Sequence, residues 1–144
     1  MVEAAPSRPA PVRILIADDD KNILLLLRRL LENHPSWRIC GEAHEGREAI
    51  DKAAQLKPDL IILDLAMPVM NGLQAGEQLS RLNPNLPLLL ISVQQVTNQV
   101  EQSARKAGFK GAVTKSNGAE VVAGVEALLR KETFFVLDGS TRVA

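Results

Sequence analysis

The sequence predicts an α/β fold in which a five-stranded parallel sheet carries helices on both faces. Three observations lead to this prediction. Short apolar runs alternate five times with stretches whose apolar residues recur at helical spacing. The apolar runs are almost free of polar residues, which is typical of parallel strands that are covered on both sides. Residues that begin or end helices, such as Asp20 and Gly108, bound the helical stretches.

The first strand is expected over residues 12–17, "VRILIA", because this β-rich run is long enough for a buried strand. Asp20 can cap the helix that follows, which ends before Pro35. Residues 37–43 predict the second strand, and residues 45–56 predict a helix with alanine and isoleucine on its inner face.

The other three strands are predicted over residues 59–64, 86–92 and 110–114. The helices that follow them are predicted over residues 71–82, 97–107 and 117–131. Asn117 and Glu120 resemble a capping box at the start of the last helix. Residues 1–11, with three prolines, are interpreted as a disordered leader. Residues 132–144 show no helical period and are expected to form a weakly packed tail or the start of a linker.

The composition of the chain narrows its class. A length of 144 residues suits one domain, and 17 basic against 17 acidic residues give no overall field that attracts nucleic acid or a membrane. No apolar run is long enough to cross a bilayer and no signal peptide is evident, so we expect a cytoplasmic protein. The single cysteine, Cys40, excludes an internal disulfide and is expected to be a buried small apolar residue. His34 and His44 are interpreted as surface residues.

Polar side chains follow four of the five predicted strands at the point where each strand ends. They are Asp18 and Asp19 after the first strand, Asp64 at the end of the third, Ser92 at the end of the fourth and Lys115 after the fifth. The carboxyl ends of parallel strands meet at one edge of the sheet, and ligands of such sheets bind there. We therefore expect these side chains to lie together.

Three clustered carboxylates repel one another, by roughly 4 kcal/mol for a pair 4 Å apart at an effective dielectric constant near 20. Such a cluster either takes up protons or binds a cation, and an open site made of oxygen ligands suits Mg²⁺. A magnesium ion beside a carboxylate, a lysine and a hydroxyl is suited to phosphoryl transfer. In this interpretation Asp64 is the nucleophile that forms an acyl phosphate. Asp19, with Asp18 beside or behind it, holds the metal, while Lys115 and Ser92 bind the phosphoryl oxygens.

The stretches "ILIADDD", "LIILDLAMPVMNGL", "LLLIS" and "GAVTKS", in this order, resemble the receiver domain of bacterial two-component response regulators. The resemblance covers residues 12–131. "VRILIADD" and "GEAHEGREAI" are most similar to receivers that precede a LuxR-type helix-turn-helix output domain. The resemblance implies a flavodoxin-like (βα)5 fold with strand order 2-1-3-4-5.

The resemblance also implies a function. Asp64 would accept a phosphoryl group from a histidine kinase, with Mg²⁺ as the cofactor. Ser92 would act as the switch hydroxyl and Lys115 as the lysine that pairs with the phosphoryl group. The implied metal ligands are Asp18, Asp19, Asp64 and the backbone carbonyl of Ala66. The face formed by the fourth helix, fifth strand and fifth helix would carry the signal, with a homodimer as one output of phosphorylation. The domain would catalyse only its own phosphorylation and dephosphorylation.

Several positions depart from the pattern of the family. Val93 follows the switch hydroxyl where a small residue is usual, and could narrow access to the phosphoryl group. Ala66 offers no side chain to position an attacking water, a role that Gln94 could take. Ala112 replaces the aromatic residue that often lies three positions before the lysine. Ser116 stands where proline often follows the lysine, so a cis bond there would cost about 3–4 kcal/mol.

Other functions fit the sequence less well. An acid-phosphatase-like hydrolase needs a second aspartate two residues after the nucleophile, where this chain has Ala66. A dinucleotide-binding domain needs glycines after the first strand, where this chain has "ADDD". A degenerate receiver that binds partners without phosphorylation is the alternative that stays open. No helix-turn-helix follows residue 131, so we expect a stand-alone or an excised receiver that reaches DNA only through an output domain not present in this chain.

Overall fold

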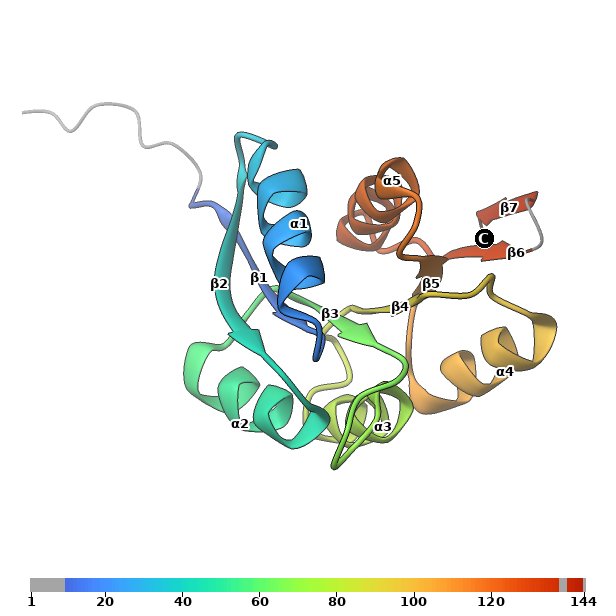
Figure 1. Cartoon of the computed structure of the whole chain (residues 1–144), viewed down its shortest axis with the longest axis horizontal. Helices are drawn as coiled ribbons and strands as arrows, with labels where there is room; N and C mark the ends of the chain where they lie inside the picture. Colours follow the sequence, from blue (N-terminus) through green and yellow to red (C-terminus); the bar gives the residue numbers. More distant parts are fainter. Residues whose placement is uncertain (1–9, 138–139, 144) are drawn as a thin grey trace, which may run out of the picture.

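The computed structural model describes residues 10–137 and 140–143; residues 1–9, most of the expected leader, lie outside this part of the chain. Strands and helices alternate from β1 to α5, and two strands follow (Figure 1). The elements are β1 (Val12–Ala17), α1 (Lys21–Glu32), β2 (Trp37–Ala43), α2 (Gly46–Leu56), β3 (Leu60–Asp64), α3 (Gly72–Leu82), β4 (Leu88–Ser92), α4 (Asn98–Ala107), β5 (Gly111–Thr114), α5 (Gly118–Leu129), β6 (Phe134–Leu137) and β7 (Ser140–Val143).

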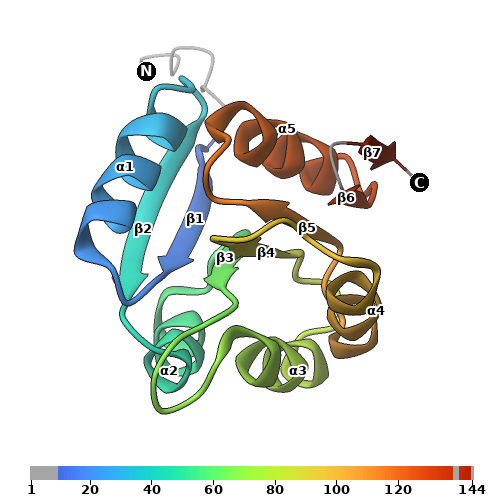
Figure 2. The same ribbon diagram turned by 45° about the vertical axis from the view of Figure 1, so that its right-hand side comes forward.

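The sheet has the order β2-β1-β3-β4-β5-β6-β7, and its first five strands are parallel in the predicted order 2-1-3-4-5. Helices α1 and α5 cover one face, and α2, α3 and α4 cover the other (Figures 1 and 2). Alternate residues of each strand therefore enter two different cores. In β1, Ile14 and Ile16 pack with α1 and α5, whereas Leu15 and Ala17 pack on the opposite side. This arrangement explains why the central strands are apolar throughout.

Helix caps fix where the chain leaves each strand end. The Asp20 side chain accepts a hydrogen bond from the Asn22 amide and begins α1, and Gly108 ends α4 in the left-handed conformation, both as predicted. The Asn117 side chain accepts a hydrogen bond from the Glu120 amide. Among the described residues, the capping box with both of its hydrogen bonds is formed by Asn71 and Gln74, at the start of α3. The loops at the carboxyl edge of the sheet are thus held by side-chain caps.

The sheet extends beyond the five expected strands. Residues 134–137 form β6, which pairs in parallel with β5, and β7 pairs antiparallel with β6. The expectation of a weakly packed tail is wrong for residues 134–136, because Phe134, Phe135 and Val136 are buried. These three consecutive residues have high β propensity and lie beside the edge of β5. They form a strand there because their side chains are buried, although their sequence shows no periodic pattern.

Two smaller expectations also need correction. Cys40 is half-buried instead of buried, and burial raises the pKa of its thiol. His44 is exposed, but His34 is half-buried and stacks on Trp37 with ring centroids 4.0 Å apart. Within residues 10–137 and 140–143, none of the helices has the length and apolar character needed to cross a membrane.

Candidate functional site

The carboxyl ends of β1 and β3 bring three carboxylates together. Asp18, Asp19 and Asp64 each offer an oxygen, and these atoms all lie within 4.8 Å of one another. The register of the two neighbouring strands pairs Ala17 with Leu63, so the residues that follow both of them lie side by side. Asp18 and Asp64 are buried, whereas Asp19 is exposed. The sequence prediction of one acidic cluster at this edge is matched by the geometry.

Lys115 reaches this cluster from the end of β5. Its ammonium lies 2.8 Å from Asp18 Oδ2 and 3.2 Å from Asp64 Oδ1, and its side chain is only 9% exposed. The backbone amide of Lys115 donates to the Ser92 carbonyl over 2.7 Å, which fixes where the side chain begins. Strand β4 lies between β5 and β3, and both β4 and β3 lie between β5 and β1, so the long lysine side chain crosses the sheet edge to meet Asp64 and Asp18.

Asp18 is held by backbone groups at one carboxylate oxygen and by Lys115 at the other. Its amide donates to the Ala43 carbonyl over 3.0 Å, and its Oδ1 accepts the Asp20 amide over 2.9 Å. The buried Oδ2 faces the Lys115 ammonium, 2.8 Å away. Three carboxylates whose oxygens lie within 4.8 Å of one another are a donor set that fits a hard divalent cation such as Mg²⁺.

The backbone after Asp64 is fixed by the turn that follows it. The Leu65 amide donates to the Ile91 carbonyl, and the Gly72 amide donates to the Leu65 carbonyl over 3.1 Å. A Cβ on Gly72 would collide with the Asp64 carbonyl oxygen, so only glycine allows α3 to begin this close to the strand end. This role was missed in the sequence, although glycine at the first position of a helix, directly after a capping asparagine, was a signal that could have shown it.

Burial and like charge act together on Asp64. Burial, followed by the neighbouring Asp18 carboxylate, raises the pKa of Asp64 from its ordinary value of 3.8 to about 6, although Lys115 and the Ala66 amide oppose this shift. Burial alone would lower the pKa of Lys115, but Asp18 and Asp64 raise it overall. Lys115 therefore carries a full positive charge at neutral pH, and Asp64 is ionised in most molecules above pH 7.

The other predicted site residues lie around this cluster. Ser92 is buried, and its hydroxyl oxygen accepts the Gln94 amide over 3.2 Å. The Ala66 amide lies 3.4 Å from Asp64 Oδ1, while Val93 is 69% exposed. The peptide bond between Lys115 and Ser116 is trans, as are the others in the described segments.

Residues 14–126 match the family of response regulator receiver domains. The chain belongs to this family. Receiver domains are signalling domains of two-component systems, and the chain is 34% identical over 103 residues to the chemotaxis protein CheY of Thermotoga maritima, covering 72% of this chain and 84% of that protein. It is also 36% identical over 110 residues to a protein-glutamate methylesterase/protein-glutamine glutaminase of Treponema pallidum. That match covers 76% of this chain but only 27% of the relative.

Solved structures agree with this assignment and include receivers of LuxR-family regulators. A two-component response regulator of the LuxR family from Aurantimonas sp. SI85-9A1 superposes with a TM-score of 0.83 at 28% identity. The superposition covers 90% of this chain and 91% of the other. The fold and the family that were predicted from the sequence motifs are confirmed.

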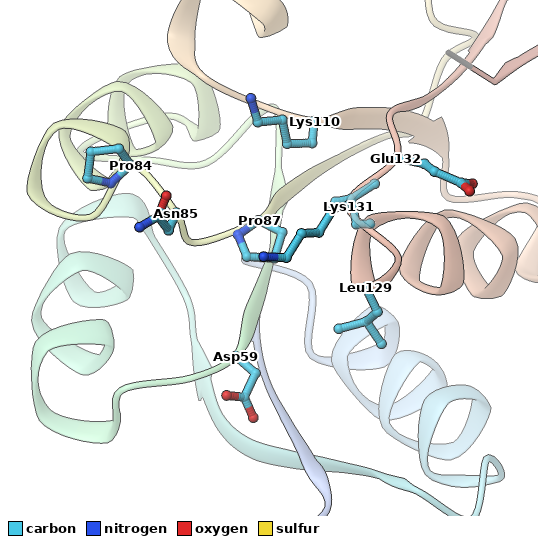
Figure 3. Close-up of a pocket in the computed structure, with 9 residues that line it drawn as sticks. Asp59, Pro84, Asn85, Pro87, Lys110, Leu129, Lys131 and Glu132 are labelled. Carbon is cyan, nitrogen blue, oxygen red and sulfur yellow. The ribbon is translucent and has the colours of Figure 1, made fainter.

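A hollow lies at the opposite edge of the sheet, where the amino ends of β3, β4 and β5 meet the end of α5. It has a volume of about 430 Å³, and Figure 3 shows its lining. Asp59, Lys110 and Lys131 are exposed around it. The hollow does not include any residue of the acidic cluster, so cavity size alone does not find the candidate site.

Proposed function

We propose that this receiver domain is a phosphoacceptor switch in which Asp64 takes a phosphoryl group from a histidine kinase. The observation that supports this most strongly is the contact of the half-buried Lys115 ammonium with two buried carboxylates, Asp18 and Asp64. A third carboxylate, that of Asp19, lies beside them. Three acidic groups at one edge of the sheet repel one another and lower the stability of the fold. Binding of a metal ion and a phosphoryl group gives a reason for this arrangement.

The reaction uses the ionised form of Asp64. A carboxylate oxygen attacks the phosphorus of a phosphohistidine, a new O–P bond forms, and the P–N bond breaks. The electron pair of that bond stays on the imidazole nitrogen, which then takes a proton from solvent. Lys115 lies 3.2 Å from the attacking carboxylate and would balance the negative charge of the phosphoryl oxygens.

A magnesium ion would be held by Asp18, Asp19, Asp64 and the carbonyl of Ala66. When bound, it supplies positive charge that neutralises the phosphoryl oxygens. The close approach of the three carboxylates supports this assignment, because their oxygens all lie within 4.8 Å of one another. Asp19 is exposed, which suits a ligand on the open side of the site.

Ser92 would report the phosphorylated state. The Gln94 amide occupies one lone pair of its hydroxyl, so the hydroxyl proton stays free for a phosphoryl oxygen. A bond from Ser92 to the phosphoryl group would draw in the residues that connect β4 with α4. The α4–β5–α5 face would then pass the signal to a partner or to a second copy of the chain, and DNA would be reached only through a separate output domain.

Incubation with Mg²⁺ and acetyl phosphate, followed by intact mass spectrometry, tests this function. We expect wild type to gain one phosphoryl group and Asp64→Asn to gain none. Asp59→Asn is a matched control, because Asp59 precedes the same strand but lies at its other end. A wild-type chain that stays unmodified would contradict the proposal and favour a degenerate receiver that binds partners without phosphorylation.

A further inference from the structure

Strand β6 occupies the edge of β5, in the middle of the α4–β5–α5 face. Its Phe134 amide donates to the Lys110 carbonyl over 2.9 Å, and Gly111 and Ala112 pair with Phe134 and Phe135. Phe134 and Val136 enter the core on the α5 side, while Phe135 enters the core on the α4 side. The strand is thus inserted between the two helices of this face (Figure 2).

The end of α5 turns the chain toward β5. Lys131 has a φ of 65°. The Glu132 and Lys131 amides donate to the Ala127 and Leu128 carbonyls over 2.9 and 3.0 Å, which is the hydrogen-bond pattern of a Schellman motif. Glycine is usual at this position, but residue 131 is a lysine. The chain therefore turns here in a left-handed backbone conformation that is unfavourable for a residue with a Cβ. The direction of the chain into β6 is fixed by the helix end.

The sequence of β5 leaves room for β6. A Cβ on Gly111 would lie 2.6 Å from the Phe134 carbonyl oxygen, so a larger residue at this position would push β6 away. Ala112, where receivers often carry an aromatic residue, pairs with Phe135, and both are completely buried in the same core. The aromatic side chain that β5 lacks is therefore supplied by β6.

Phe135 links β6 to the elements that follow Ser92. The Arg105 guanidinium of α4 lies 4.1 Å from the centre of the Phe135 ring and pairs with Glu101 over 2.7 Å. Val96, four residues after Ser92, is 1% exposed and belongs to the same core as Phe135. A pull on Ser92 that shifts Val96 or α4 would disturb the packing around Phe135, because a close-packed core does not deform smoothly.

We propose that β6 is an intramolecular cover of the α4–β5–α5 face, anchored by Phe135, and that its docking and the phosphorylation of Asp64 oppose each other. This inference rests on the proposed function. Phosphorylation loosens β6 and uncovers the face, and loosening β6 favours phosphorylation to the same extent, since the coupling between two sites is reciprocal. The Phe135 ring thus couples Asp64, which takes the phosphoryl group, to the α4–β5–α5 face, which carries the signal.

Hydrogen exchange of the full chain, followed by mass spectrometry, tests the coupling. Peptides that contain residues 134–136 are compared with and without Mg²⁺ and acetyl phosphate, and intact mass records phosphorylation of the same samples. We expect their exchange to become on the order of fivefold faster in the phosphorylated chain. Full phosphorylation with unchanged exchange would overturn the inference and leave the proposed function intact, whereas a chain that takes no phosphoryl group would overturn both.

A pair of variants tests the coupling from the other side. Phe135→Leu weakens the anchor, and we expect it to bind Mg²⁺ with beryllofluoride, a mimic of the phosphoryl group, on the order of fivefold more tightly than wild type, the weaker end of allosteric coupling. Phe109→Leu is the control, because Phe109 is buried in the same core but packs against Gly76 of α3. Equal beryllofluoride affinities for the two variants, at similar losses of thermal stability, would show that β6 is only structural.

Discussion

The two edges of the parallel sheet both carry acidic and basic side chains but hold them differently. At the carboxyl edge, Asp18 and Asp64 are buried, and the half-buried Lys115 contacts both. At the amino edge, Asp59 and Lys110 are exposed around a hollow of about 430 Å³. Two unit charges 4 Å apart interact by about 1 kcal/mol in water but by about 4 kcal/mol at an effective dielectric constant of 20. Charges at the carboxyl edge therefore interact more strongly than those at the amino edge, because they are removed from water.

The largest difference between the edges should come from their lysines. Lys115→Met keeps the apolar stem but removes the charge that faces Asp64, and we expect phosphorylation by acetyl phosphate to slow by about 100-fold or more. Lys110→Met makes the same change at the amino edge and should leave the rate within about twofold of wild type. Rates are measured by intact mass against time. Similar losses in both variants would remove the distinction between the edges.

The next effect concerns stability and pH in metal-free buffer. Burial and Asp18 raise the pKa of Asp64 to about 6, so between pH 4 and 6 the folded chain binds more protons than the unfolded chain. The contribution of Asp64 to stability is therefore greatest below pH 4 and is lost as the pH rises through 6. We expect Asp64→Asn to be more stable than wild type by about 2 kcal/mol at pH 7.5, with a smaller gain at pH 4.5.

Urea unfolding at the two pH values measures this difference. Asp59→Asn, at the exposed edge, is expected to change stability by less than about 0.5 kcal/mol at either pH. An Asp64→Asn variant that is less stable than wild type at pH 7.5 would show that this carboxylate is stabilised by its surroundings.

Metal binding gives a smaller effect. At a Mg²⁺ concentration ten times its dissociation constant, we expect the wild-type free energy of unfolding to rise by about 1.4 kcal/mol. Asp19→Ala should lose most of this gain, whereas Asp51→Ala, which removes an exposed carboxylate of α2, should keep it. The check is thermal unfolding with and without Mg²⁺. An undiminished gain in Asp19→Ala would place the ion elsewhere.

The smallest effect compares backbone conformation at the two edges. Val69, in the loop after Asp64, has a φ of 66°, and Lys131, at the opposite edge, has a φ of 65°. A left-handed conformation costs a residue with a Cβ about 1–2 kcal/mol, and more for a β-branched one. We expect Val69→Gly to stabilise the chain by about 1 kcal/mol and Lys131→Gly by about half of that, as measured by urea unfolding. Loss of stability in both variants would contradict the conformational argument.

The sequence predicts well where the acidic cluster lies, because the information for its position is local. Each of these side chains follows an apolar run, and parallel topology then brings Asp18, Asp64 and Lys115 to one edge without further knowledge. The cover strand could not be predicted in this way. Phe135 is buried only because Ala112 is small and the neighbouring strand edge is open, and both conditions lie far from it in the chain. The role of Gly72 was missed for the same reason, since it depends on a close approach to the Asp64 carbonyl.

The position of β6 in the chain also has a consequence for biosynthesis. Synthesis proceeds from the amino end, so the ribosome releases Phe135 only after every other element of the core around it has emerged. Until then the nascent domain exposes an unpaired strand edge with an empty apolar groove beside Ala112, a surface prone to aggregation. A gene truncated after residue 131 would make this transient hazard permanent.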